Sequence, residues 1–170
     1  MKNLISILFL LISVTASAQH LQVAYKSYGN GQSMCIIPPT INNFIYLLDC
    51  SENEFRKEMS NYKYFEEDSN GKYISYWNGS ITNFTYVNAC TRFAYNLMRD
   101  EIRCIVQDNM VYPPNAISDF YRSLKPYYVK SGYDYDGNVI DFFSMDLNYH
   151  TYEFYLSKSG DYYDITVLKK

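Results

Sequence analysis

The chain has 170 residues, a net charge of −3 and an apolar content of 48%, which is enough for one globular domain with its own core. Lysine and arginine are scattered along it rather than clustered, so the charge pattern argues against nucleic acid as a partner. Twenty tyrosines and ten phenylalanines favour a sheet-rich protein with much aromatic surface.

The first 18 residues have the pattern of a cleavable signal peptide. Lys2 gives a positive start, Leu4 to Val14 are mostly apolar, and Ala16 to Ala18 supply the small residues of a cleavage site. The alternative is a membrane anchor, but this apolar run has 11 residues and a spanning helix needs about 20. We expect the mature chain to begin near Gln19 and to be periplasmic or secreted, with no membrane span.

Capping and apolar spacing then organise the rest of the chain. Residues 19–39 form a lead-in segment, and residues 40–170 form one domain in which Thr40 caps the first helix and Ser51 with Glu54 forms a capping box for the second. The predicted helices cover residues 41–48, 51–62 and 115–124. The predicted strands cover residues 72–77, 88–95, 101–107, 139–145, 151–156 and 162–168.

The two halves of the domain, about 40–110 and 111–170, have similar patterns. The helical spacing that begins at Phe55 recurs 65 residues later, and the strand pattern that ends at Trp77 recurs 66 residues later at Phe143. The alternative is coincidence between two aromatic-rich amphipathic segments. Two units, each a helix followed by three strands, predict an α+β fold, a mainly antiparallel sheet with helices packed on one face.

Alternation along these strands assigns the aromatic residues to the two faces of the sheet. The residues expected to face the helices are Tyr76, Phe142, Phe154, Ile165 and Val167. An aromatic platform is expected on the other face, formed by Tyr73, Trp77, Phe143, Tyr155 and Tyr162. Such residues anchor protein interfaces and also stack on sugar rings. The alternative is that another layer, such as residues 19–39, covers this face.

Four cysteines lie in the exported part of the chain, and an even number outside the cytoplasm permits two disulfides. A hairpin centred on Leu97 places Cys90 opposite Cys104, which leaves Cys35 to pair with Cys50. The alternative is four buried free thiols.

The sequence offers no catalytic motif, no metal set and no cofactor motif. His150 is the only histidine inside the domain and is expected in a turn, and no Gly-x-Ser-x-Gly element exists. Residues 134–138 and 66–71 gather oxygen ligands of the kind that calcium takes, but turn chemistry explains both segments. We therefore expect no catalytic residue and no bound metal.

The order of elements resembles that of known modules. A short helix, a polar turn, a second helix with the spacing of Ser51, Phe55 and Met59, and then an antiparallel sheet are similar to the beta-lactamase inhibitor protein, to SmpA-type outer-membrane assembly lipoproteins, and to small exported bacterial proteins of unknown function. The resemblance covers about residues 40–107. The chain lacks the lipid-attachment cysteine of the SmpA type, and its second half has one predicted helix where the inhibitor's repeat has two. The resemblance implies protein binding through an exposed sheet face and assigns no residue a role.

These observations lead to one principal expectation and its alternatives. We expect an exported, non-enzymatic binding module that engages an envelope or extracellular protein through the aromatic face. The alternatives are a glycan-binding module that uses the same aromatics, a structural domain, or an enzyme that uses carboxylates alone.

Overall fold

The computed structural model describes residues 20–28, 32–69, 71–78, 80–82, 85–87, 91–107 and 112–170. The predicted signal peptide lies outside these residues. Within the described ranges, no helix is long and apolar enough to cross a membrane.

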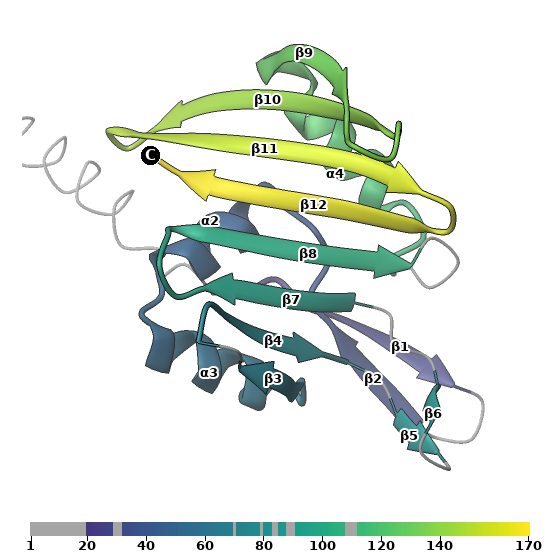
Figure 1. The fold of residues 1–170 in the computed structure, drawn as a ribbon. Helices are drawn as coiled ribbons and strands as arrows, with labels where there is room; N and C mark the ends of the chain where they lie inside the picture. The colour runs from purple at the N-terminus through teal and green to yellow at the C-terminus, as the bar shows by residue number, and fades with distance from the viewer. Residues whose placement is uncertain are drawn as a thin grey trace, which may run out of the picture.

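An eight-stranded antiparallel sheet forms the centre of the molecule, in the order β3-β4-β7-β8-β12-β11-β10-β9 (Figure 1). This confirms the predicted α+β class. The strands of the first half are β3 (Phe65–Ser69), β4 (Tyr73–Trp77), β7 (Thr91–Asn96) and β8 (Glu101–Gln107). Those of the second half are β9 (Tyr128–Tyr133), β10 (Val139–Leu147), β11 (His150–Ser159) and β12 (Tyr162–Lys169).

The two halves of the chain have the same topology. In each half a helix is followed by four strands of the large sheet, of which the first lies at an outer edge and the fourth at the centre; the first half also contains β5 and β6, which form a separate small sheet. The halves meet where β8 pairs with β12, in a register that sets Cys104 opposite Ile165 and Ile102 opposite Val167. The repeat therefore contains four strands per unit rather than the three predicted from the sequence.

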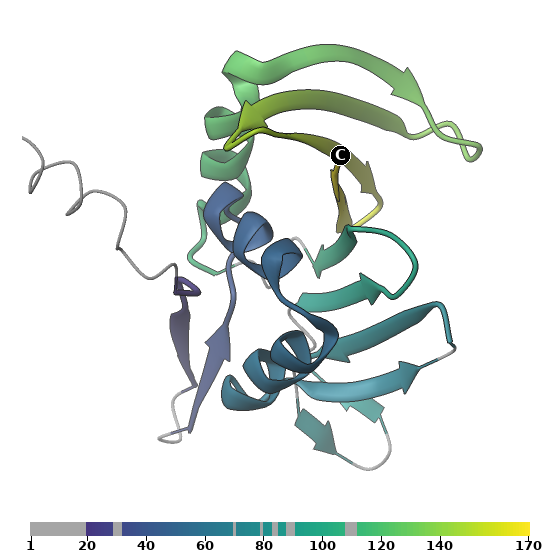
Figure 2. The same ribbon diagram turned by 90° about the vertical axis from the view of Figure 1, so that its left-hand side faces the viewer.

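All three helices of the described chain lie on one face of the sheet (Figure 2). They are α2 (Ile41–Asp49), α3 (Glu52–Asn61) and α4 (Ala116–Leu124), the last continued by a 3₁₀ turn, η2 (Lys125–Tyr127). The predicted caps are formed: the Thr40 side chain accepts a hydrogen bond from the Asn43 amide, and Ser51 and Glu54 form the reciprocal capping box. These bonds satisfy backbone groups that the helices leave unpaired at their first turns.

The core lies between the helices and the sheet, and it joins the two halves through Phe44 of α2. The Phe44 ring lies 6.3 Å from that of Phe93 on β7 and 5.4 Å from that of Phe120 on α4. Phe120 in turn packs on Phe154 of β11. Each of these side chains is at most 2% exposed, so the hydrophobic effect holds both halves together through one helix.

The N-terminal segment is fixed on the helix side of the molecule. It contains the hairpin of β1 (Ala24–Tyr28) and β2 (Gln32–Ile36). The buried amide of Asn43 donates to the carbonyls of Gln22 and Pro38, and its oxygen accepts from the Gln22 amide. The sequence allows residues 19–39 to cover the face of the sheet away from the helices. The contacts of the described residues in this segment attach it to α2 instead. A further small hairpin pairs β5 (Ser80–Thr82) with β6 (Thr85–Val87).

One face assignment was wrong. Phe143 lies on the helix face, is 0% exposed, and packs edge-on against Tyr121 of α4. Its neighbour Phe142 lies on the opposite face and stacks on Tyr155. The sequence pattern aligns the two halves with an offset of 66 residues, which is an even number. Tyr76 and Phe143, which both face the helices, are separated by an odd number of residues. Because side chains alternate with a period of two, an error of one residue exchanges the two faces.

This correction predicts unequal effects for two adjacent phenylalanines. Phe143→Ala removes a fully buried ring and should lower the free energy of unfolding by about 3–5 kcal/mol. Phe142→Ala loses one stacked, partly exposed ring and should cost about 1 kcal/mol. Urea unfolding followed by Trp77 fluorescence measures both values. Equal losses, or a larger loss at Phe142, would contradict the assignment.

Candidate functional site

The face of the sheet away from the helices, here called the open face, is turned toward the viewer in Figure 1. One row of residues that are paired strand to strand crosses seven of the strands. From β9 to β4 the row consists of Lys130, Phe142, Tyr155, Thr166, Arg103, Ala94 and Ser75. Large side chains dominate the row from β9 to β8, where Thr166 is the one smaller residue, and two small residues, Ala94 and Ser75, lie next to each other at the β4 end.

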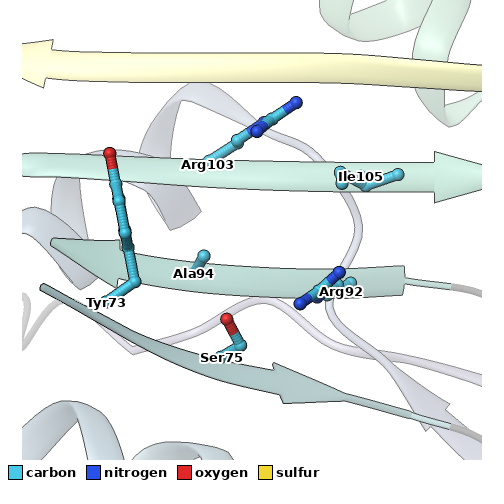
Figure 3. Close-up of a pocket in the computed structure, with 6 residues that line it drawn as sticks. All are labelled: Tyr73, Ser75, Arg92, Ala94, Arg103 and Ile105. Atoms are coloured by element: carbon cyan, nitrogen blue, oxygen red, sulfur yellow. The ribbon is translucent and has the colours of Figure 1, made fainter. Parts of the chain in front are cut away.

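Those small residues create a pocket of about 200 Å³ over β4, β7 and β8 (Figure 3). Ser75 and Ala94 face each other in register and form its floor. Larger side chains on β4, β7 and β8 surround these two residues. The lining consists of Tyr73, Ser75, Arg92, Ala94, Arg103 and Ile105.

Arg92 is placed by an ion pair that reaches across β4. Its Nη2 lies 2.8 Å from a carboxylate oxygen of Glu67. The register of β3 shifts between Glu66 and Asp68, and a bulge of this kind re-aims the extra side chain, here that of Glu67. The Nε of Arg92 is buried and has no hydrogen-bond partner among the described residues.

Arg103 is fixed from the opposite side by Asp164 of β12. The Arg103 Nε lies 2.9 and 3.0 Å from the two carboxylate oxygens of Asp164, and the Nη2 of Arg103 also donates to Asp164. Hydrogen bonding to Asp164 raises the pKa of the guanidinium further, so this side chain is a fixed cation. Its orientation is set by a neighbouring strand rather than by its own.

Tyr73 closes the other end of the pocket. Its hydroxyl donates a 3.0 Å hydrogen bond to Glu101, a carboxylate that is only 8% exposed. Burial and the adjacent Glu101 raise the pKa of the Tyr73 phenol, so the hydroxyl keeps its proton at neutral pH.

A second depression of about 430 Å³ adjoins the first and shares Arg92 and Ile105 with it. It continues over β12, where Tyr162 and Asp164 line it. The two hollows make a polar and aromatic surface that extends from β4 to β12.

The predicted aromatic platform is only partly present. Tyr73, Tyr155 and Tyr162 lie on the open face as expected, and Tyr162 is 49% exposed. Phe143 is on the helix face. Trp77 is 4% exposed, because it lies in register between Phe65 of β3 and Arg92 of β7.

The sequence reasoning missed both arginines of the pocket. Alternation within residues 91–96 and 101–107 already places Arg92 and Arg103 on the polar side of their strands. What brings them to one pocket is the pairing of Ala94 with Arg103 and of Arg92 with Ile105. The hairpin register assumed from the sequence did not contain these pairs.

The histidine considered for catalysis lies at one end of a strand in the second half of the sheet. His150 begins β11 in an exposed position and its ring lies 6.4 Å from that of Tyr152. Within the described ranges, no group of three or more His, Cys, Asp or Glu side chains is placed to hold a metal ion.

The two acidic segments considered for calcium are engaged in local structure. Asp134 accepts hydrogen bonds from the backbone amides of Asp136 and Asn138 and from the Asn138 side chain, which lower the pKa of its carboxyl. In the other segment, Glu66 accepts from Arg56 at 2.6 Å and from the Tyr76 hydroxyl at 2.8 Å.

Neither predicted disulfide is formed. Cys35, Cys50 and Cys104 are free, and Cys90 lies outside the described residues. The register pairs Cys104 with Phe93 rather than with Cys90. Burial raises the pKa of the Cys50 thiol to about 11, and raises those of Cys35 and Cys104 as well.

A scan against protein-family models and searches of curated proteins and of solved structures find no match to this chain. The geometry of the open face is therefore the basis for the proposed function.

The free thiols give a direct test in a Cys90→Ser background. Unfolded, unreduced protein should react with iodoacetamide at all three remaining cysteines. In the native state at pH 8, Cys35 should react first, because it is partly exposed, and Cys104 should be protected by its burial and high pKa. Mass spectrometry of the alkylated peptides gives the order. Alkylation of one cysteine alone in the unreduced, unfolded protein would contradict the free-thiol state.

Proposed function

We propose that this protein is an exported, non-enzymatic binding module that engages an envelope or extracellular protein through the open face of its sheet. The single observation that carries the proposal is the combination of tyrosines and arginines around two hollows, on a sheet face that no described helix covers. Tyrosine and arginine are over-represented among the residues that dominate binding energy at protein interfaces.

The rigidity of this face supports the proposal. Its side chains stand on strands that are paired on both sides, from β4 to β10. Ion pairs to Glu67 and Asp164 hold the two arginines in place. A surface that is already ordered loses little conformational entropy when a partner binds.

The export part of the proposal rests on the charge, apolar run and cleavage-site pattern of residues 1–18. The first residue of the described core is Leu21, which is 6% exposed. A chain that begins at Gln19 retains every buried residue of the described core, so it is the appropriate form for binding experiments.

A glycan ligand is less well supported by the same geometry. Trp77 is the strongest sugar-stacking residue of the chain, and it is 4% exposed. The rings of Phe142 and Tyr155 stack on each other with centroids 4.9 Å apart, so each has one face already covered.

Tyrosines inside and outside the open face give a matched test of the binding surface. Residues 19–170, immobilised on a resin, should capture a protein from envelope or culture-supernatant extracts of cells that make this chain. The variant Tyr155→Ser/Tyr162→Ser should bind the purified partner about tenfold or more weakly, because each interface anchor contributes more than about 1 kcal/mol. Surface plasmon resonance gives the dissociation constants.

The control is Tyr133→Ser/Tyr149→Ser, which removes two tyrosines that are 78% and 108% exposed and lie outside the open-face row. It should bind as the unmutated chain does. Equal loss in both variants, or loss in neither, would contradict binding through the open face. Saturable binding of oligosaccharides without capture of any protein would support the glycan alternative instead.

A further inference from the structure

The pocket over Ser75 and Ala94 has a chemical character of its own within the open face. Two of its six lining residues carry guanidinium groups, and none carries a carboxylate. The acids that hold these arginines, Glu67 and Asp164, are not among its lining residues.

Each guanidinium keeps a donor that its internal partner does not use. The Nη2 of Arg92 is paired with Glu67, and its Nε is enclosed by protein where no ligand can reach it, so Nη1 is the nitrogen outside both. Arg103 binds Asp164 through its Nε and Nη2, so its Nη1 lies outside that ion pair. A guanidinium nitrogen outside the internal ion pair can still donate to a ligand acceptor in the pocket.

The remaining surface of the pocket suits a short apolar stem. Ala94 and Ile105 present methyl and methylene groups, and the pocket holds about 200 Å³. This combination matches a carboxylate on one or two methylenes, because a planar guanidinium binds the two oxygens of a carboxylate in a bidentate way.

The charge balance around the pocket sets an upper limit on the charge of the ligand. Glu67 and Asp164 already neutralise the two arginines, and Glu101 adds one more carboxylate beside Tyr73. A doubly charged phosphate would be repelled by these three acids. A singly charged group gains hydrogen bonds with less repulsion, and its binding should be weak and sensitive to salt.

We propose that Arg92 and Arg103, with Ala94 beneath them, form a recognition site for one carboxylate, supplied by an aspartate or glutamate side chain of the partner protein. This inference rests on the proposed function, since it names the group that the open face recognises. It requires no change in the fold, because both arginines are already oriented.

The test uses blocked tripeptides as probes, so that the side chain is the only variable. Residues 19–170 are labelled with ¹⁵N and titrated with acetyl-Gly-Glu-Gly-amide or with acetyl-Gly-Gln-Gly-amide. The Glu peptide should shift the Nε–H signals of Arg92 and Arg103 and the backbone amides of Ser75 and Ala94, with a dissociation constant of roughly 1–20 mM. The Gln peptide should bind about tenfold more weakly, since it lacks the charge-assisted bonds.

Two variants separate the pocket from general charge attraction. Arg92→Gln should weaken binding of the Glu peptide about tenfold, since it removes one of the two cations. Ala94→Leu should abolish binding, because it fills the floor while keeping both arginines. Arg122→Gln is the matched control: Arg122 is an exposed arginine paired with Asp119 on α4, outside the pocket, and its loss should change nothing.

Equal affinity for the two peptides, binding that survives Ala94→Leu, or no saturable shift with the Glu peptide would each overturn the carboxylate site. The proposal that the open face binds a protein is tested separately. A captured partner that is lost in Tyr155→Ser/Tyr162→Ser but retained in Arg92→Gln would leave the open face as the interface and remove only the carboxylate site.

Discussion

The pairing of β8 with β12 is the constraint on which the rest of the structure depends. It joins two helix-plus-four-strand units into one continuous sheet, so that neither central strand is left as an edge. Phe44 reinforces this junction from the helix side, since its ring contacts Phe93 of the first unit and Phe120 of the second. A single helix thus closes the core across both halves.

The one-sided placement of the helices determines what the other side of the sheet can do. Every helix of the described chain, together with the N-terminal segment that Asn43 attaches, lies away from the open face. The strands there still alternate, so each presents a second set of side chains that no described helix covers. Polar and aromatic residues occupy these positions, and their cross-strand contacts replace the packing that a second helix layer would give.

The candidate site follows from small residues as much as from charged ones. Ser75 and Ala94 are adjacent in register, and larger side chains at either position would fill the pocket. The arginines beside them are fixed by acids from β3 and β12, strands that lie on opposite sides of the β7–β8 hairpin. The site therefore requires residues from five strands, and it exists only once the sheet is complete.

The sequence by itself determined the local elements and the class of fold. Thr40, Ser51 and Glu54 marked the helix starts correctly, because capping is a contact within four residues. Periodicity located the six inner strands of the large sheet, but it missed the edge strands β3 and β9 and the two small hairpins, β1–β2 and β5–β6. β3 is a short acidic edge strand, and β9 is exposed at every position.

Register was decided only by the tertiary structure. The exchange of Phe142 with Phe143, the pairing of Cys104 with Phe93, and the meeting of Arg92 with Arg103 all depend on which residues stand opposite each other. Strand pairing is set by the packing of the whole sheet and by the turns that connect it. A displacement of one residue leaves the local pattern unchanged and exchanges the faces.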